Sequence, residues 1–152
     1  MFIHKIRQFL RFYWGAVTRY QLHSPVVFDL AQALIHDRRW YYAFNDIEAI
    51  RARMLQSDVV LHFTDFGAGA ASGSLPLRRV ARRSASSGEQ GRRLFRLANW
   101  LQPKALLELG TSVGVGTMYL ASGAGNARFI TLEGAADCAA VAQSNLELLG
   151  LP

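Results

Sequence analysis

The sequence predicts an α/β fold in which helices precede a strand–helix–strand unit. The apolar run at residues 105–109 is too short for a helix and is typical of a buried strand. A loop rich in glycine and hydroxyl residues follows at once, and residues 117–121 then have the character of a helix. A second strand, residues 127–132, completes a βαβ unit, in which the strands are parallel and the crossover is right-handed.

The loop after the first strand has the composition of a site for an anionic ligand. Its glycines, Gly110, Gly114 and Gly116, let the backbone approach a ligand and reach positive φ. The loop leads into a helix N-terminus, where free N–H groups and the positive end of the helix dipole favour an anion. Glu133 ends the second strand 23 positions after Gly110, a place suited to accepting a ribose hydroxyl pair. The pattern predicts a nucleoside ligand with an acidic or phosphorylated tail.

The residue order in the loop distinguishes between classes of nucleoside binder. The dinucleotide fingerprint G-x-G-x-x-G does not fit residues 110–116. The run ELGTSVG at residues 108–114 instead resembles motif I of the class I, Rossmann-like, S-adenosylmethionine-dependent methyltransferases, and it is most similar to their O-methyltransferase branch. The resemblance extends over residues 86–150, since Glu89-Gln90-Gly91 and the leucines after it are similar to the segment before motif I. A different nucleotide binder, or a glycine loop without a ligand, remains an alternative.

The resemblance implies a cofactor, a reaction and a set of binding residues. The cofactor is S-adenosyl-L-methionine, and the reaction is direct displacement at its sulfonium methyl by an acceptor that we expect to be a small molecule. The expected cofactor-binding residues are Glu108, Gly110, Thr111, Ser112, Gly114, Gly116 and Glu133. Thr111 and Ser112 are expected to meet the methionine end, and Glu133 the ribose hydroxyls. Glu108 is expected to fix the loop or, indirectly, the methionine ammonium, and no residue is assigned as the catalytic base.

The resemblance also divides the chain into three predicted parts. Residues 1–57 form an N-terminal helical cap, residues 58–85 a strand with a loop rich in glycine and arginine, and residues 86–152 the first half of the Rossmann-like domain. A methyltransferase of this class resembles a seven-stranded sheet, and only its first two strands fall within the sequence. The chain is therefore expected to be a truncated, N-terminal half of the enzyme, with apolar sheet surface exposed.

Three helices are expected before residue 57. Residues 2–20 are amphipathic, and this helix is expected to cover the core or a dimer mate, with a membrane surface as the alternative. Ser24 is a predicted N-cap with Pro25 at the first helical position of a helix that ends near residue 36. Asn45, with Glu48 three residues on, predicts the start of the third helix. The predicted buried face of the second helix comprises Val26, Val27, Leu30, Ala33 and Leu34, and that of the third comprises Ile47, Ile50 and Met54.

Two other stretches compete for functional roles. The glycine-rich residues 67–74 follow a predicted strand at residues 59–66, but no helix can open beneath them, so a mobile surface loop or lid is predicted. The arginines of residues 77–84 and the aromatic residues 40–44 leave open an RNA-binding or RNA-modifying protein. A solvated charge run and an aromatic plug between helices are the favoured interpretations of these two segments.

Composition limits the remaining possibilities. The chain is 51% apolar and 18% charged, as globular proteins are, and its net charge of +6 permits contact with nucleic acid or an anionic membrane. The single cysteine, Cys138, predicts a reducing, cytoplasmic location and is expected to be a packing residue. The histidines show no ligand spacing, so no metal site is predicted, and neither a signal peptide nor a spanning helix is expected. A homo-oligomer through the N-terminal helix, or a non-catalytic oligomerising or membrane-surface fragment, stays open.

Overall fold

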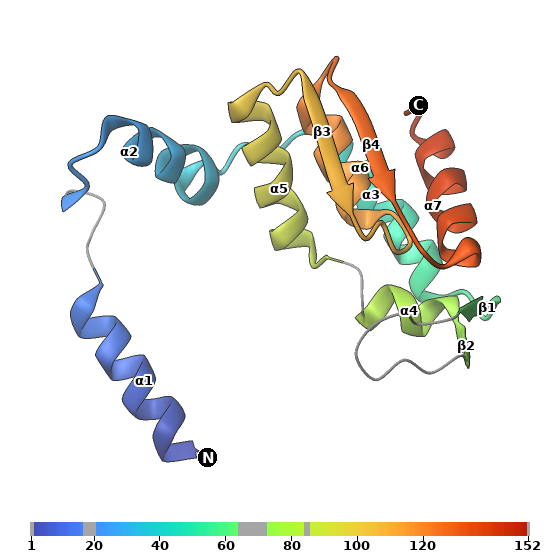
Figure 1. Ribbon diagram of the computed structural model, residues 1–152, viewed down its shortest axis with the longest axis horizontal. Helices are drawn as coiled ribbons and strands as arrows, with labels where there is room; N and C mark the ends of the chain where they lie inside the picture. Colours follow the sequence, from blue (N-terminus) through green and yellow to red (C-terminus); the bar gives the residue numbers. More distant parts are fainter. Residues whose placement is uncertain (1, 17–20, 64–72, 84–85, 152) are drawn as a thin grey trace. The chain divides into compact units, whose positions relative to one another are not determined.

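The computed structural model describes residues 2–16, 21–63, 73–83 and 86–151. Contacts within the chain divide it into two units, Met1–Asp37 and Arg38–Pro152. Figure 1 gives the order of the elements in each unit.

The first unit is helical and contains α1 (Phe2–Gly15), α2 (Pro25–Ala31) and the π-helical turn η2 (Gln32–His36). The predicted start of α2 is confirmed, because the Ser24 side chain accepts a hydrogen bond from the Val27 N–H and Pro25 opens the helix.

The predicted buried face of this second helix is wrong. Val26 is 62% exposed and Val27 46% exposed, and the described residues of α2 and η2 include none that is buried. A helix of two turns buries an apolar stripe only where another layer packs over it.

The second unit begins with α3 (Tyr42–Leu55), whose inward face is confirmed. Its buried residues are Phe44, Ile47, Ile50 and Met54. The predicted cap at Asn45 is wrong, because the helix begins three residues earlier, after Tyr41, and the Asn45 side chain accepts from the Trp40 indole N–H at 3.0 Å. The prediction grouped residues 38–57 with the N-terminal helices, whereas the buried face of α3 joins the core of the second unit.

Aromatic rings explain why α3 starts early. The Phe44 ring is fully buried and makes edge contacts with Trp40, Tyr41 and Phe95. Such contacts favour a fixed orientation of the rings and draw the turn before Asn45 into the helix. Trp40 and Tyr42 are exposed, so part of this aromatic segment lies in the core and part on the surface.

A small antiparallel sheet and a helix follow. The strand β1 (Val60–Phe63) pairs with β2 (Gly73–Pro76), and α4 (Leu77–Arg83) begins directly after it. The strand predicted at residues 59–66 is confirmed for β1, whereas most of the predicted glycine-rich loop lies outside the described residues. On α4, Leu77, Val80 and Ala81 are buried while Arg79, Arg82 and Arg83 are exposed, so the arginine run forms the outer face of a helix.

The βαβ unit is confirmed in its order and its strand direction. The helix α5 (Gly88–Leu101) precedes β3 (Ala105–Leu109), α6 (Val115–Ala124), β4 (Arg128–Leu132) and α7 (Ala136–Leu148). The strands β3 and β4 are parallel, from Ala105 opposite Arg128 to Leu109 opposite Leu132, and lie side by side in Figure 1. Ser87 caps α5 in a capping box with Gln90.

Glycines allow α5 and α6 to pack closely. A Cβ atom added at Gly91 would lie 2.2 Å from the Tyr119 ring, and one at Gly123 would lie 2.4 Å from the Phe95 carbonyl oxygen. The two helices and α3 enclose the Tyr119 side chain, which is fully buried and donates a hydrogen bond from its hydroxyl to Glu48 at 2.8 Å. This packing holds α6, and with it the loop that precedes α6, in a fixed position.

Candidate functional site

The parallel register brings the glycine loop and Glu133 to the same edge of the sheet. Leu109 and Leu132 are paired, so Gly110 and Glu133 follow side by side at the carboxyl ends of β3 and β4. The N–H groups of Gly110 and Thr111 donate to the Leu132 carbonyl at 2.9 and 3.3 Å. Ligands of parallel α/β sheets bind at this edge, outside the carboxyl ends of the strands.

The Glu133 carboxylate is in direct contact with the loop. Its Oε2 accepts from the Ser112 N–H at 2.7 Å, and its Oε1 accepts from the Ala135 N–H at 2.9 Å. The side chain is half-buried. Because a carboxylate has about four acceptor positions, both oxygens keep capacity for ligand hydroxyls.

The three loop glycines have different surroundings. Gly110 has φ +93°, and nothing lies within 4 Å of a Cβ added there. The backbone of Gly110 therefore borders open space that a ligand could enter. Gly114 has φ +83°, and a Cβ there would lie 3.1 Å from Ala142, so this glycine permits α7 to pack behind the loop. Gly116 lies in the first turn of α6, where a Cβ would lie 3.3 Å from Glu108 Oε1. Close approach of a ligand is therefore best supported at Gly110.

The start of α6 retains the features of an anion site. The N-cap residue is Gly114, which has no side chain to occupy the first N–H groups of this ten-residue helix. Ser112, with φ +50°, lies in the turn that delivers the chain to the helix. The N–H groups in the first turn of α6 and the positive end of its dipole favour a carboxylate or phosphate at this place.

Glu108 organises a hydrogen-bonded cluster beneath the loop. Its Oε2 accepts from the hydroxyls of Thr117 at 2.6 Å and Thr131 at 2.8 Å. The Thr111 and Thr131 hydroxyls are 2.5 Å apart, and since the Thr131 proton is given to Glu108, Thr111 donates to Thr131. The cluster joins β3, β4, α6 and the loop. Of the two roles expected for Glu108, fixing the loop or acting indirectly on the methionine ammonium, the cluster supports the first.

This cluster also changes the interpretation of Thr111. Its side chain is buried, with 6% exposure, and its hydroxyl is turned toward Thr131 within the cluster. Sequence reasoning missed Thr117 and Thr131 as partners of Glu108. Both threonines lie in otherwise apolar segments of the sequence. This placement indicates a hydrogen-bond partner nearby, because a buried hydroxyl requires one.

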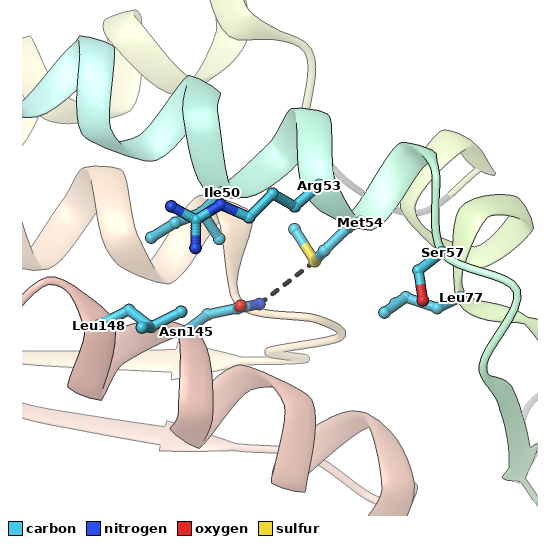
Figure 2. A pocket seen from close by; sticks show the side chains of 7 residues that line it. All are labelled: Ile50, Arg53, Met54, Ser57, Leu77, Asn145 and Leu148. Atoms are coloured by element: carbon cyan, nitrogen blue, oxygen red, sulfur yellow. Dashed lines mark hydrogen bonds between the residues drawn. The ribbon is translucent and has the colours of Figure 1, made fainter.

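Asn145 supports the loop from behind. Its side-chain amide donates to the Val113 carbonyl at 2.9 Å and contacts the Met54 sulfur at 3.2 Å, and the residue is 6% exposed. Figure 2 shows the second of these contacts at the wall of a cavity of about 250 Å³. The cavity is lined by Ile50, Arg53, Met54, Ser57, Leu77, Asn145 and Leu148. Sequence reasoning missed Asn145, although a polar residue on the inward face of a helix was visible.

Cys138 is buried, as expected of a packing residue. Burial, assisted by the charges of Glu133 and Asp137, raises the pKa of its thiol, so the thiol is protonated at neutral pH. Among the described residues, no group of three or more His, Cys, Asp or Glu side chains lies together as metal ligands do. In the same part of the chain, no helix has the length and apolar character needed to cross a bilayer.

Comparisons with known proteins are consistent with the loop sequence. No protein-family model matches the chain. A catechol O-methyltransferase of Mycobacterium tuberculosis (strain ATCC 25618 / H37Rv) is 41% identical over 83 residues, which make up 54% of this chain and 36% of the relative. The chain thus spans about a third of the length of the curated relative that it matches.

Two solved structures are also similar to the chain. A putative O-methyltransferase from Klebsiella pneumoniae has a TM-score of 0.48 at 24% identity, over 84% of this chain and 46% of that one. Cofactor-bound Rv0187 from MTB has a TM-score of 0.47 at 28% identity, over 86% and 49% of the two chains. The expected resemblance to O-methyltransferases is confirmed by the curated relative, because the chain is similar in sequence to an O-methyltransferase over 83 residues.

Proposed function

We propose that the chain forms the S-adenosyl-L-methionine-binding part of an O-methyltransferase. The observation that carries the proposal is the 2.7 Å hydrogen bond from the Ser112 N–H to Glu133. It brings the acid at the end of β4 against the glycine loop that follows β3. A ligand at this edge of the sheet meets a carboxylate, the open space beside Gly110 and a helix N-terminus together.

Each part of the cofactor has a chemically matched group in this arrangement. The ribose hydroxyls are donors, and Glu133 supplies acceptor oxygens for them. The methionine carboxylate is an anion, which the N–H groups in the first turn of α6 and the positive end of the helix dipole favour. Gly110, with open space beside it, lets the backbone lie close to the ligand. Glu108 acts beneath the loop, through Thr117 and Thr131, and not at the cofactor itself.

We propose a small hydroxylated molecule as the methyl acceptor. The curated relative is a catechol O-methyltransferase, and its name specifies a small phenolic compound. Bound cofactor supplies the sulfonium methyl, and the acceptor oxygen has to be held in line with it, so positioning contributes much of the rate. A cytoplasmic location fits both this chemistry and the single buried cysteine.

Calorimetric titration of S-adenosylhomocysteine into the chain tests the proposal. We expect saturable binding that Glu133→Ala weakens by at least about tenfold, because the ribose hydroxyls lose a charged acceptor worth roughly 1.5–3 kcal/mol. Glu133→Gln keeps one acceptor oxygen and is expected to lie between the two.

Glu147→Ala is the matched control, since it removes the same charge from an exposed position on α7. It is expected to bind like the unmodified chain. Circular dichroism establishes that each variant is folded. A folded chain without binding, or equal losses in Glu133→Ala and Glu147→Ala, contradicts the proposal.

A further inference from the structure

The helix α1 carries an exposed apolar face that the proposed cofactor site does not use. The described residues of this face are Ile6, Phe9, Leu10, Tyr13 and Trp14, with exposures of 43, 64, 41, 70 and 80%. At about 100° per residue they lie within roughly 140° of the helix circumference. Exposed apolar residues that form a contiguous patch indicate an interaction surface.

Positive charge surrounds this apolar face. On the helical projection Lys5 lies between Phe9, at one edge of the face, and the exposed Phe12 beyond it. Arg7 lies beside Trp14 at the other edge, and Arg11 lies on the opposite side. All three basic side chains are exposed. The first acidic residue in the sequence is Asp29, well after the end of α1. The helix is therefore cationic along its whole length.

We propose that α1 binds the surface of an anionic membrane, with its axis in the plane of the headgroups. The apolar face enters the boundary between headgroups and acyl chains, as in other basic amphipathic helices. Lys5 and Arg7, at the two edges of the face, extend to the lipid phosphates. Tyr13 and Trp14 have the amphipathic rings that are enriched at this depth. This inference is independent of the proposed cofactor site.

Charge distinguishes this occupant from a second copy of the helix. Two α1 helices that met through their apolar faces would bring Lys5 and Arg7 of each copy together, without an acid on either helix to pair with them. Anionic lipid headgroups complement the same residues.

The face is also poorly suited to nucleic acid. Ile6 and Leu10 offer no ring for base stacking, and the Phe9 and Tyr13 rings stack on each other with centroids 6.3 Å apart.

Co-sedimentation of the full chain with vesicles tests the proposal. We expect binding to vesicles of equal parts phosphatidylglycerol and phosphatidylcholine, and little binding to pure phosphatidylcholine. Each basic residue at an anionic surface strengthens binding on the order of fivefold, so the loss of Lys5 and Arg7 is expected to weaken binding about 25-fold. The triple variant Lys5→Gln/Arg7→Gln/Arg11→Gln, which also removes the more distant Arg11, is expected to lose at least this much. Trp14→Ala is expected to weaken binding as well, through the lost apolar contact.

The matched control is Arg79→Gln/Arg82→Gln/Arg83→Gln on α4, which removes the same charge from three exposed positions outside α1. It is expected to keep most of the binding. An equal loss in both triple variants overturns the proposal, because net charge alone would then explain the binding. So does binding to neutral vesicles that matches binding to anionic ones. Self-association that Trp14→Ala abolishes would assign the face to a second copy of α1 and overturn the proposal. Tighter binding to single-stranded RNA than to vesicles would assign the face to nucleic acid and overturn it as well.

Discussion

At the scale of single residues, Asn145 joins segments that are far apart in the sequence. Its amide binds the Val113 carbonyl within the glycine loop and touches Met54 on α3. Val113 is fully buried, so its carbonyl has no access to bulk water if the amide is removed. One side chain on α7 thus fixes the backbone of the candidate cofactor loop.

We expect Asn145→Leu to lower the free energy of unfolding by about 1–3 kcal/mol, because a buried carbonyl loses its donor. Urea denaturation followed by circular dichroism measures this change. Gln143→Leu is the control, since Gln143 is exposed on the same helix and its amide contacts Glu147. Equal stabilities of the two variants would show that the Val113 carbonyl does not depend on Asn145.

At the scale of elements, Tyr119 connects α6 to α3. Its ring fills the space that Gly91 leaves on α5, and its hydroxyl donates to Glu48 at 2.8 Å. Burial is the main cause that raises the pKa of Tyr119 above its ordinary value of 10.0, and the hydrogen bond and charge of Glu48 add to it. The nearby guanidinium groups of Arg92 and Arg51 act in the opposite direction.

This contact predicts a loss of stability in alkali. Above pH 10 the unfolded chain releases the Tyr119 proton while the folded chain keeps it, so the free energy of unfolding falls as the pH rises. In Tyr119→Phe we expect a flatter dependence on pH, together with a lower stability at neutral pH because Glu48 loses a donor.

Urea denaturation between about pH 8 and pH 11 measures this dependence. Tyr42→Phe is the control, because Tyr42 is 92% exposed and is expected to leave the profile unchanged. Parallel profiles for Tyr119→Phe and the unmodified chain would contradict the assignment.

At the scale of the whole second unit, the β3–β4 sheet has one covered face and one exposed face. Glu108 and Thr131 point toward α6, whereas the alternate residues point away from it. Four of those alternate residues are large, apolar and exposed: Leu107 at 61%, Leu109 at 75%, Ile130 at 43% and Leu132 at 55%. Parallel sheets are normally covered on both faces.

We expect the 152-residue chain to self-associate through this exposed sheet face. Leu109→Gln/Leu132→Gln should reduce association without unfolding the chain, because both side chains are already in solvent. Sedimentation velocity over a range of concentrations measures the effect. The control is Leu101→Gln/Leu148→Gln, which changes two leucines of similar exposure on α5 and α7. Association that responds equally to both pairs would contradict a specific role of the sheet face.

The sequence by itself determined the features that depend on local order along the chain. The strand, loop and helix of the βαβ unit follow from apolar runs and glycine positions. The parallel pairing then places Glu133 beside the loop, because both strands end at the same edge. Capping at Ser24 and Ser87 was predictable for the same reason, since a capping side chain bonds to a backbone N–H three residues away.

Tertiary structure alone decided which surfaces meet. The spacing of Gly114 suggested ligand contact, but the residue also makes room for Ala142 on α7. The start of α3 moved from Asn45 to Tyr42 because Phe44 packs on Phe95, some 50 residues away in the sequence. Asn145 gained a role because a loop 32 residues earlier presents a buried carbonyl to it. Such contacts depend on the shapes of distant side chains, which the periodicity of a local segment does not encode.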